Sequence, residues 1–387
     1  MNESARALLA RHPLIDGHND FPWAHRQLAG YDMDQLDPAT RLTGTHTDLV
    51  RLRQGGVGAQ FWSVYVPSSL AGDAAVAATL EQIDFVHQLV ARHPDQLGLA
   101  LTADEVRSVF ASGRVASLIG AEGGHSIACS MAALRALYAL GTRYLTLTHN
   151  DNVPWADSAT DEARLGGLGP FGHEVVREMN RLGMLVDLSH VSQGTMSDAL
   201  DTSEAPVIFS HSSCRQLVDH PRNVPDVILA RLPANGGVCM VTFVPYFVSS
   251  ACAAWSDQLS AAMTTAGLDP GDWSSRMSFG AEFERRSPRP AATVAQVADH
   301  IEHVREVAGI DFVGIGGDFD GCDAMPVGLD DVSGYPELFA ELGQRGWSEA
   351  ECAKVAGGNV LRALSEAEAV AARASKERGP SRARFDG

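Results

Sequence analysis

Short apolar runs rich in β-branched and aromatic residues alternate along the chain with segments of helical periodicity. Eight such runs lie at residues 12–18, 57–66, 115–123, 142–150, 183–190, 205–212, 236–244 and 311–321. Apolar residues recur with the three-to-four-residue spacing of a helix between several of them, at residues 71–94, 130–141, 174–183 and 292–309. Near-continuous apolar strands that alternate with helices indicate a parallel sheet covered on both faces.

Eight strand and helix units predict a closed (β/α)8 barrel, the TIM barrel of the α/β class, over residues 1–370. A doubly wound open sheet is the alternative. One segment, at about 248–290, lacks clean periodicity and holds several aromatic residues. We expect it to be an ordered insertion, either a lid over the functional site or a plain surface insertion. The polar and basic segment 371–387 is expected to be a disordered tail.

Charge and composition exclude several classes of partner. The 387 residues include 48 acidic and 30 basic ones, which gives a net charge of −18. This balance argues against nucleic acid and against anionic membrane surfaces. The six cysteines are scattered without CxxC spacing, so no disulfide framework is expected. No apolar run reaches the length of a membrane span or a signal peptide, and we therefore expect a cytoplasmic protein.

Polar side chains gather where most of the predicted strands end. In chain order these residues are His18, Asp20, Glu122, His149, His190, His211, Asp318 and Asp320. The carboxyl ends of all strands of a barrel meet at one rim, where the active site lies. Histidines and carboxylates brought together at neutral pH are typical ligands of zinc or a similar divalent metal.

The spacing of these residues suggests two metal ions. His18 and Asp20 can both face the centre, Glu122 can bridge two ions with its two oxygens, and His190 and His211 can complete the second ion. Two metals would hold and activate a hydroxide between them. The segment GGDFDG (316–321) lacks the ligand ladder of a calcium loop, so its first aspartate is better interpreted as a proton shuttle.

Seven motifs occur in an order that resembles one known family. They are DGHND (16–20), EGG (122–124), LTHN (147–150), DLSH (187–190), SHSSCR (210–215), RNVPD (222–226) and GGDFDG. Together they resemble the renal, or membrane, dipeptidase family of zinc metallopeptidases, which are barrels of the amidohydrolase type. The resemblance covers residues from about 10 to about 370.

This resemblance implies a role for each motif residue. His18, Asp20 and Glu122 would bind one Zn2+, and Glu122, His190 and His211 would bind the second. His149 would polarise the scissile carbonyl, although the polar residues after it also make it a candidate metal ligand. Arg222 would bind the free C-terminal carboxylate of the substrate. Asp318 would carry the proton from the hydroxide to the leaving amine.

The function expected from the resemblance is hydrolysis of free dipeptides, including L-Xaa-D-Xaa, by a hydroxide that bridges two zinc ions. A homodimer is also what the resemblance suggests. Two alternatives stay open. The same binuclear site would serve an N-acyl amino acid deacylase or a hydrolase of lactams and related cyclic amides. The second alternative is a barrel that binds metal ions as a scaffold and catalyses no reaction.

Overall fold

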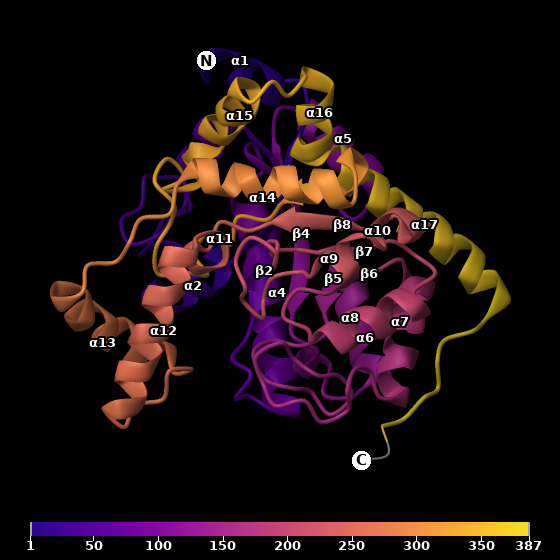
Figure 1. The fold of residues 1–387 in the computed structure, drawn as a ribbon. Coiled ribbons are helices and arrows are strands. Elements are labelled where there is room, and N and C mark those ends of the chain that lie inside the picture. Colours follow the sequence, from indigo (N-terminus) through magenta and orange to yellow (C-terminus); the bar gives the residue numbers. More distant parts are fainter. Residues whose placement is uncertain (1, 386–387) are drawn as a thin grey trace.

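The computed structural model describes residues 2–385 and has a parallel β-barrel at its centre (Figure 1). The strands are β1 (Leu14–Asn19), β2 (Val57–Tyr65), β3 (Leu97–Leu99), β4 (Val115–Glu122), β5 (Thr142–Thr146), β6 (Leu185–Asp187), β7 (Val207–Phe209), β8 (Val238–Val241) and β9 (Val313–Ile315). Every pairing between neighbouring strands is parallel.

Direct pairing of β2 with β4 closes the barrel. Seven consecutive pairs join them, from Ala59 with Ala116 to Tyr65 with Glu122. The closed ring therefore contains eight strands, and the predicted (β/α)8 barrel is confirmed. Strand β3 was not predicted. It is three residues long and pairs with the first part of β4 outside the ring.

Helices connect the strands and cover the barrel. They are α1 (Asn2–Leu9), α2 (Phe21–Ala29), α3 (Leu49–Gly55), α4 (Asp73–Arg92), α5 (Ala103–Ala111), α6 (Met131–Ala139), α7 (Pro170–Leu182), α8 (Gln193–Thr202), α9 (Asp226–Leu229), α10 (Leu232–Asn235), α11 (Pro245–Val248), α12 (Ser250–Thr265), α13 (Trp273–Arg286), α14 (Val294–Val307), α15 (Tyr335–Gln344), α16 (Glu349–Ala353) and α17 (Asn359–Glu377). Four single turns complete the set, at Gly124–Ile127, Ile310–Phe312, Val332–Gly334 and Lys354–Gly358.

Alternation along the strands builds two apolar layers. Phe61, Leu118 and Tyr144 belong to one buried apolar cluster, whereas their chain neighbours Trp62 and Ile119 belong to a second one. Both sets are fully buried. Because each strand is covered on two faces, its sequence reads as a continuous apolar run.

The insertion at 248–290 is helical, contrary to the absence of periodicity noted in its sequence. Helices α12 and α13 form an arm that projects from the barrel (Figure 1). On α12, Trp255, Leu259 and Met263 recur at helical spacing and pack on Phe279 and Phe283. Alanine and serine residues between them make this stripe narrow, which is why the pattern is weak.

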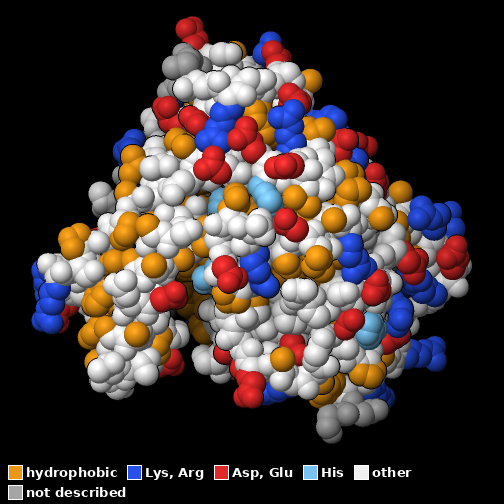
Figure 2. All heavy atoms as spheres, viewed as in Figure 1, with side chains coloured by type: hydrophobic (Ala, Val, Ile, Leu, Met, Phe, Trp, Pro, Cys, Tyr) orange, Lys and Arg blue, Asp and Glu red, His pale blue; other side chains and the backbone are white. Residues whose placement is uncertain are grey.

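The base of the arm is tied to the loop that follows β9. The guanidinium of Arg289 lies 2.7 Å from a carboxylate oxygen of Asp323, and it stacks over Trp255 at 4.5 Å. A hollow separates the arm from the rest of the surface (Figure 2). Closure of the arm as a lid stays a prediction.

The C-terminal segment is more ordered than its polar sequence suggested. Helix α17 continues to Glu377, past the expected boundary at residue 370, because Val370 and Ala374 extend its buried face. Beyond the helix, the backbone N–H of Ser381 donates to Glu178 at 3.0 Å, and Phe385 packs edge-on against Phe171 at 5.8 Å. Residues 386–387 of the expected tail lie outside the described residues. Among residues 2–385, no helix has the length and apolarity needed to cross a membrane.

Candidate metal centre

Each candidate side chain stands at or just beyond the carboxyl end of a barrel strand. His18 lies on β1, with Asp20 directly after it, and Glu122 ends β4. His149 follows β5, His190 follows β6, His211 and Arg222 follow β7, and Asp318 follows β9. Because all eight strands are parallel, these positions meet at one rim of the barrel.

Glu122 lies at the centre of the group. Its Oε2 atom is 3.5 Å from His18 Nε2, and its Oε1 atom is 2.9 Å from His190 Nε2 and 3.4 Å from His211 Nε2. His18 Nε2 is also 3.2 Å from Asp20 Oδ2. The two oxygens of one carboxylate thus face two separate sets of ligand atoms, as a bridging ligand requires.

Three overlapping groups of side chains have their ligand atoms within 4.8 Å of one another. They are His18 with Glu122 and His211, Glu122 with His149 and His190, and His18 with Asp20 and Asp318. His18 Nε2 and Asp20 Oδ1 are buried and have no hydrogen-bond partner among the described residues. Buried polar atoms are normally satisfied, so these two atoms fit a set of metal ligands.

Burial shifts the pKa values of several candidate ligands, in the direction that metal binding needs for three histidines and in the opposite direction for Glu122. It lowers the pKa of His149, His190 and His211 well below the ordinary value of histidine, and nearby positive groups lower it further. The three imidazoles are therefore neutral at neutral pH and keep a lone pair for a metal. Burial also raises the pKa of Glu122, and the nearby charge of Asp20 raises it further. Cations would relieve this crowding of carboxylates.

A tyrosine inside the barrel orients His18, and this contact was not predicted from the sequence. The Tyr144 hydroxyl lies 2.9 Å from His18 Nδ1 and 3.2 Å from the carbonyl oxygen of Gly17. A carbonyl can only accept, so the hydroxyl gives its one proton to Gly17 and accepts from the N–H at Nδ1. When the ring is neutral, as metal binding requires, this arrangement leaves the lone pair of His18 on Nε2, which faces Asp20 and Glu122.

His211 is oriented by a chain of polar groups that also went unpredicted. Its Nδ1 atom lies 2.8 Å from the hydroxyl of Ser210, and that hydroxyl donates to Asp187 Oδ2 at 2.6 Å. The Thr146 hydroxyl donates to the same Asp187 oxygen at 2.5 Å. The motifs DLSH and SHS that contain Asp187 and Ser210 were the available signal, because each places a polar residue beside a histidine.

Asp318 sits on a strained turn beside the ligand cluster. Its backbone φ angle is 60°, in the left-handed region that residues other than glycine rarely adopt. Its Oδ1 atom lies 4.0 Å from His18 Nε2, farther than the nearest oxygen of Asp20. Burial raises the pKa of Asp318 well above its usual range, and the charges of Asp20 and Glu122 add to the rise while His18 opposes it. Strain of this kind is typical of functional turns.

The turn also depends on a glycine. A Cβ atom at Gly321 would lie 2.2 Å from both Asp20 Oδ2 and Asp318 Oδ1, so a larger residue there would displace these two carboxylates. Asp320, which the sequence placed with the other strand-end residues, is turned to a different partner. It accepts a hydrogen bond from the backbone N–H of His46 at 2.5 Å and is 3.8 Å from His46 Nδ1.

Arg222 is a buried guanidinium without an anionic partner. It is 3% exposed, and no carboxylate of residues 2–385 lies within 4.0 Å of it. Its guanidinium donates to the Ser212 hydroxyl and to the carbonyl of His211, and both contacts are long, at 3.4 Å. Phe247 of α11 lies beneath its plane at 5.3 Å. A buried charge without a counterion is costly, and this one is available to bind an anion.

His149 lies at the more open side of the cluster. Its side chain is 13% exposed, compared with 8% for His190 and 1% for His211. The distance from its Nε2 atom to Glu122 Oε1 is 3.8 Å, longer than for the other two. The centre of its ring lies 4.4 Å from that of His190 and 4.9 Å from that of Tyr65, and both pairs of rings are tilted. Of the three imidazoles it is the one best placed to reach a molecule entering the rim.

Comparison with known proteins agrees with this geometry. A family model for membrane dipeptidases (peptidase family M19) matches residues 2–378. Dipeptidase verJ of Clonostachys rogersoniana is 45% identical over 379 residues, covering 95% of this chain and 87% of that protein. Dipeptidase 3 of Mus musculus is 41% identical over 375 residues, covering 96% and 67% respectively.

Solved structures show the same architecture. The crystal structure of the probable dipeptidase PvdM from Pseudomonas aeruginosa superimposes with a TM-score of 0.83 at 25% identity, over 95% of this chain and 98% of that chain. A structure described as the dipeptidase AC, a metallopeptidase, gives a TM-score of 0.75 at 25% identity, over 92% and 98%.

Proposed function

Because the chain belongs to the membrane dipeptidase family of metallopeptidases, we propose that it hydrolyses the peptide bond of free dipeptides at the rim of its barrel. The proposed ligands are His18, Asp20 and Glu122 for one Zn2+, and Glu122, His190 and His211 for a second. When bound, two such cations would lower the pKa of a water molecule and polarise the scissile carbonyl.

The unpaired charge of Arg222 is the observation that carries this proposal. A dipeptide differs from an internal peptide segment by its free carboxylate, and the guanidinium fork matches a carboxylate in two parallel hydrogen bonds. The long contacts of Arg222 to neutral oxygens would be exchanged for charge-assisted ones. Substrate binding would thereby supply the counterion that the described residues do not.

His149 and Asp318 have the positions that the two remaining tasks require. His149 stands at the open side of the cluster with a neutral ring, so one N–H can donate to the carbonyl oxygen as negative charge develops there. Asp318 lies next to the ligands with a pKa raised by burial, so it can take a proton and return it to the leaving amine.

Turnover of a dipeptide and of its C-terminal amide tests the proposal. Amidation removes the charge that Arg222 would bind, so kcat/KM should fall about 10- to 100-fold, the equivalent of one charge-assisted hydrogen-bond pair. In Arg222→Met the acid and amide should be turned over almost equally. Arg231 pairs with Asp201 at the surface, and Arg231→Met is the matched control that should keep the wild-type ratio.

Equal turnover of acid and amide by the wild-type protein would refute the role of Arg222. The same assay includes N-acyl amino acids and cyclic amides, because an N-acyl amino acid offers Arg222 the same carboxylate. We propose that free dipeptides, including those with a D-residue at the second position, give the highest kcat/KM. A preference for N-acyl amino acids would reassign the substrate while keeping the metal site.

A further inference from the structure

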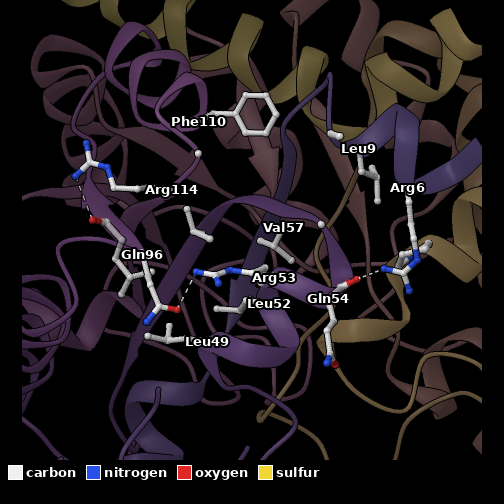
Figure 3. Close-up of a pocket in the computed structure, with 16 residues that line it drawn as sticks. Arg6, Leu9, Leu49, Leu52, Arg53, Gln54, Val57, Gln96, Phe110 and Arg114 are labelled. Carbon is white, nitrogen blue, oxygen red and sulfur yellow. Dashed lines mark hydrogen bonds between the residues drawn. The ribbon is translucent and has the colours of Figure 1, made fainter. Parts of the chain in front are cut away.

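A pocket lies at the opposite end of the barrel from the metal centre. It opens where β2, β3 and β4 begin, between α1, α3 and the end of α5, and has a volume of about 400 Å³ (Figure 3). The strands run from this pocket toward the rim that holds Glu122. None of the residues assigned to the metal centre lines it.

The interior of the pocket is apolar and rigid. Leu9, Leu52, Val57 and Leu97 line it and are each no more than 6% exposed. The ring of Phe110 stands over the same space beside Leu9 (Figure 3). These side chains come from two helices, two strand starts and the end of α5, all of which are fixed by the barrel. A preformed apolar cavity of this size suits a small organic molecule.

The mouth of the pocket carries positive charge only. Arg6, Arg53 and Arg114 line it together with Gln54 and Gln96, and no aspartate or glutamate does so. None of the three arginines forms an ion pair with a carboxylate of residues 2–385. This is unusual in a chain whose net charge is −18, because acidic residues outnumber basic ones by 48 to 30.

Neutral oxygen atoms hold the arginines in place. Arg114 donates to the carbonyls of Pro94 and Leu97 at 3.3 and 3.4 Å, and Arg53 donates to the Gln96 side chain at 3.3 Å. Arg6 donates to the carbonyl of Gln54 at 2.5 Å. Figure 3 shows Arg6 and Arg114 on opposite sides of the pocket with Arg53 between them. Neutral acceptors orient a guanidinium without neutralising its charge, so each can still bind an anion.

We propose that this pocket binds a small organic anion, a molecule with an apolar body and a carboxylate, sulfonate or phosphate group. The apolar body would lie on Leu52, Leu97 and Phe110, and the anionic group would bind the arginines at the mouth. This site is separate from the catalytic rim, so the proposal stands independently of the reaction assigned there.

Anilinonaphthalene sulfonate is the probe that tests this site, because it joins an apolar aromatic body to one negative charge. Fluorescence titration of the folded protein should show saturable binding. The neutral analogue N-phenylnaphthylamine, which lacks the sulfonate, should bind at least about tenfold more weakly. Equally tight binding of the neutral dye, or no saturable binding of the anionic dye, would overturn the proposal.

A double variant and a matched control test whether the arginines bind the anion. The double substitution Arg53→Gln and Arg114→Gln should weaken sulfonate binding by about tenfold or more. Arg107→Gln is the matched control, because Arg107 lies on α5 and is paired with Asp104 at 2.8 Å, and it should bind as the wild type does.

Ala10→Trp tests the position by steric means. Ala10 lines the pocket and is exposed, so a tryptophan there can fill the mouth without entering the core. It should abolish dye binding and leave dipeptide turnover unchanged. The single variant Arg53→Gln changes an exposed residue and complements this test. If both Ala10→Trp and Arg53→Gln bound the dye as tightly as the wild type, the dye would bind elsewhere and the proposed site would be refuted.

Discussion

Replacing Tyr144 by phenylalanine tests how the barrel interior controls the metal centre. The change removes one hydroxyl from a residue that is completely buried, and with it the 2.9 Å contact to His18 Nδ1 and the 3.2 Å bond to Gly17. His18 then keeps an N–H that has no acceptor, or shifts its proton to Nε2, where the metal should bind. Either outcome weakens the ligand.

The size of the effect follows from these contacts. Leaving a buried donor unsatisfied costs about 1–3 kcal/mol, so the free energy of unfolding of the metal-free protein should fall by about that amount. Loss of the group that orients a metal-bound histidine costs about 10- to 100-fold in metal affinity, equivalent to about 1.4–2.7 kcal/mol. Catalytic activity should fall at limiting zinc and recover when zinc is in excess, since Tyr144 does not reach the substrate.

Competitive zinc titration against a chromophoric chelator measures this affinity, with dipeptide turnover followed in the same samples. Tyr138→Phe is the control, because Tyr138 is a half-buried tyrosine on α6 that stacks on Arg143 away from the rim. His18→Ala sets the lower limit of affinity. Wild-type zinc affinity in Tyr144→Phe, together with a loss in His18→Ala, would show that the hydroxyl does not position His18.

Three further changes probe other parts of the structure. Gly120→Ala should lower the free energy of unfolding by at least about 1–3 kcal/mol, because the Cβ of the alanine would lie 1.9 Å from the Tyr144 ring. Urea unfolding measures this change, and an unchanged free energy of unfolding would refute the packing of Tyr144 on Gly120. Asp318→Asn should keep its metal and lower kcat by about 10²- to 10⁴-fold, since asparagine tolerates the left-handed turn but cannot carry the proton; metal loss would instead make Asp318 a ligand. His300 is buried, accepts from the Cys214 N–H at 3.0 Å, and has a pKa lowered by burial from 6.5 to about 4. As the pH falls, His300 takes up a proton in the unfolded chain before it does so in the folded protein, so the free energy of unfolding should be constant above the unfolded pKa and fall by up to about 3 kcal/mol as the pH drops to the folded pKa. His300→Gln should flatten this dependence of stability on pH. Equal slopes in the variant and the wild type would show that His300 is not the group responsible.

The sequence predicted the barrel, and it predicted that the candidate ligand residues meet at one rim, because both depend on local order. His18, Glu122 and His211 each end an apolar run, so strand direction alone places them at one rim. Tyr144 could not be predicted as a partner of His18, because 126 residues separate them and only closure of the barrel brings the two strands face to face. Asp187 lay in a recognised motif, but its contact with Ser210 depends on the register of β6 against β7.

Other features were hidden for different reasons. The apolar stripe of α12 is interrupted by small residues, which weakens its helical pattern. The arginine-lined pocket is assembled from segments that begin near residues 6, 53 and 114, and each arginine in isolation is typical of a surface residue.

The metal content of the purified protein decides whether the barrel rim binds a pair of cations. We propose that His18, Asp20, Glu122, His190 and His211 bind a pair of divalent cations, with Glu122 shared between them. Elemental analysis after saturation with zinc and removal of the excess should give two equivalents per chain. One equivalent or none in the folded protein would contradict the account.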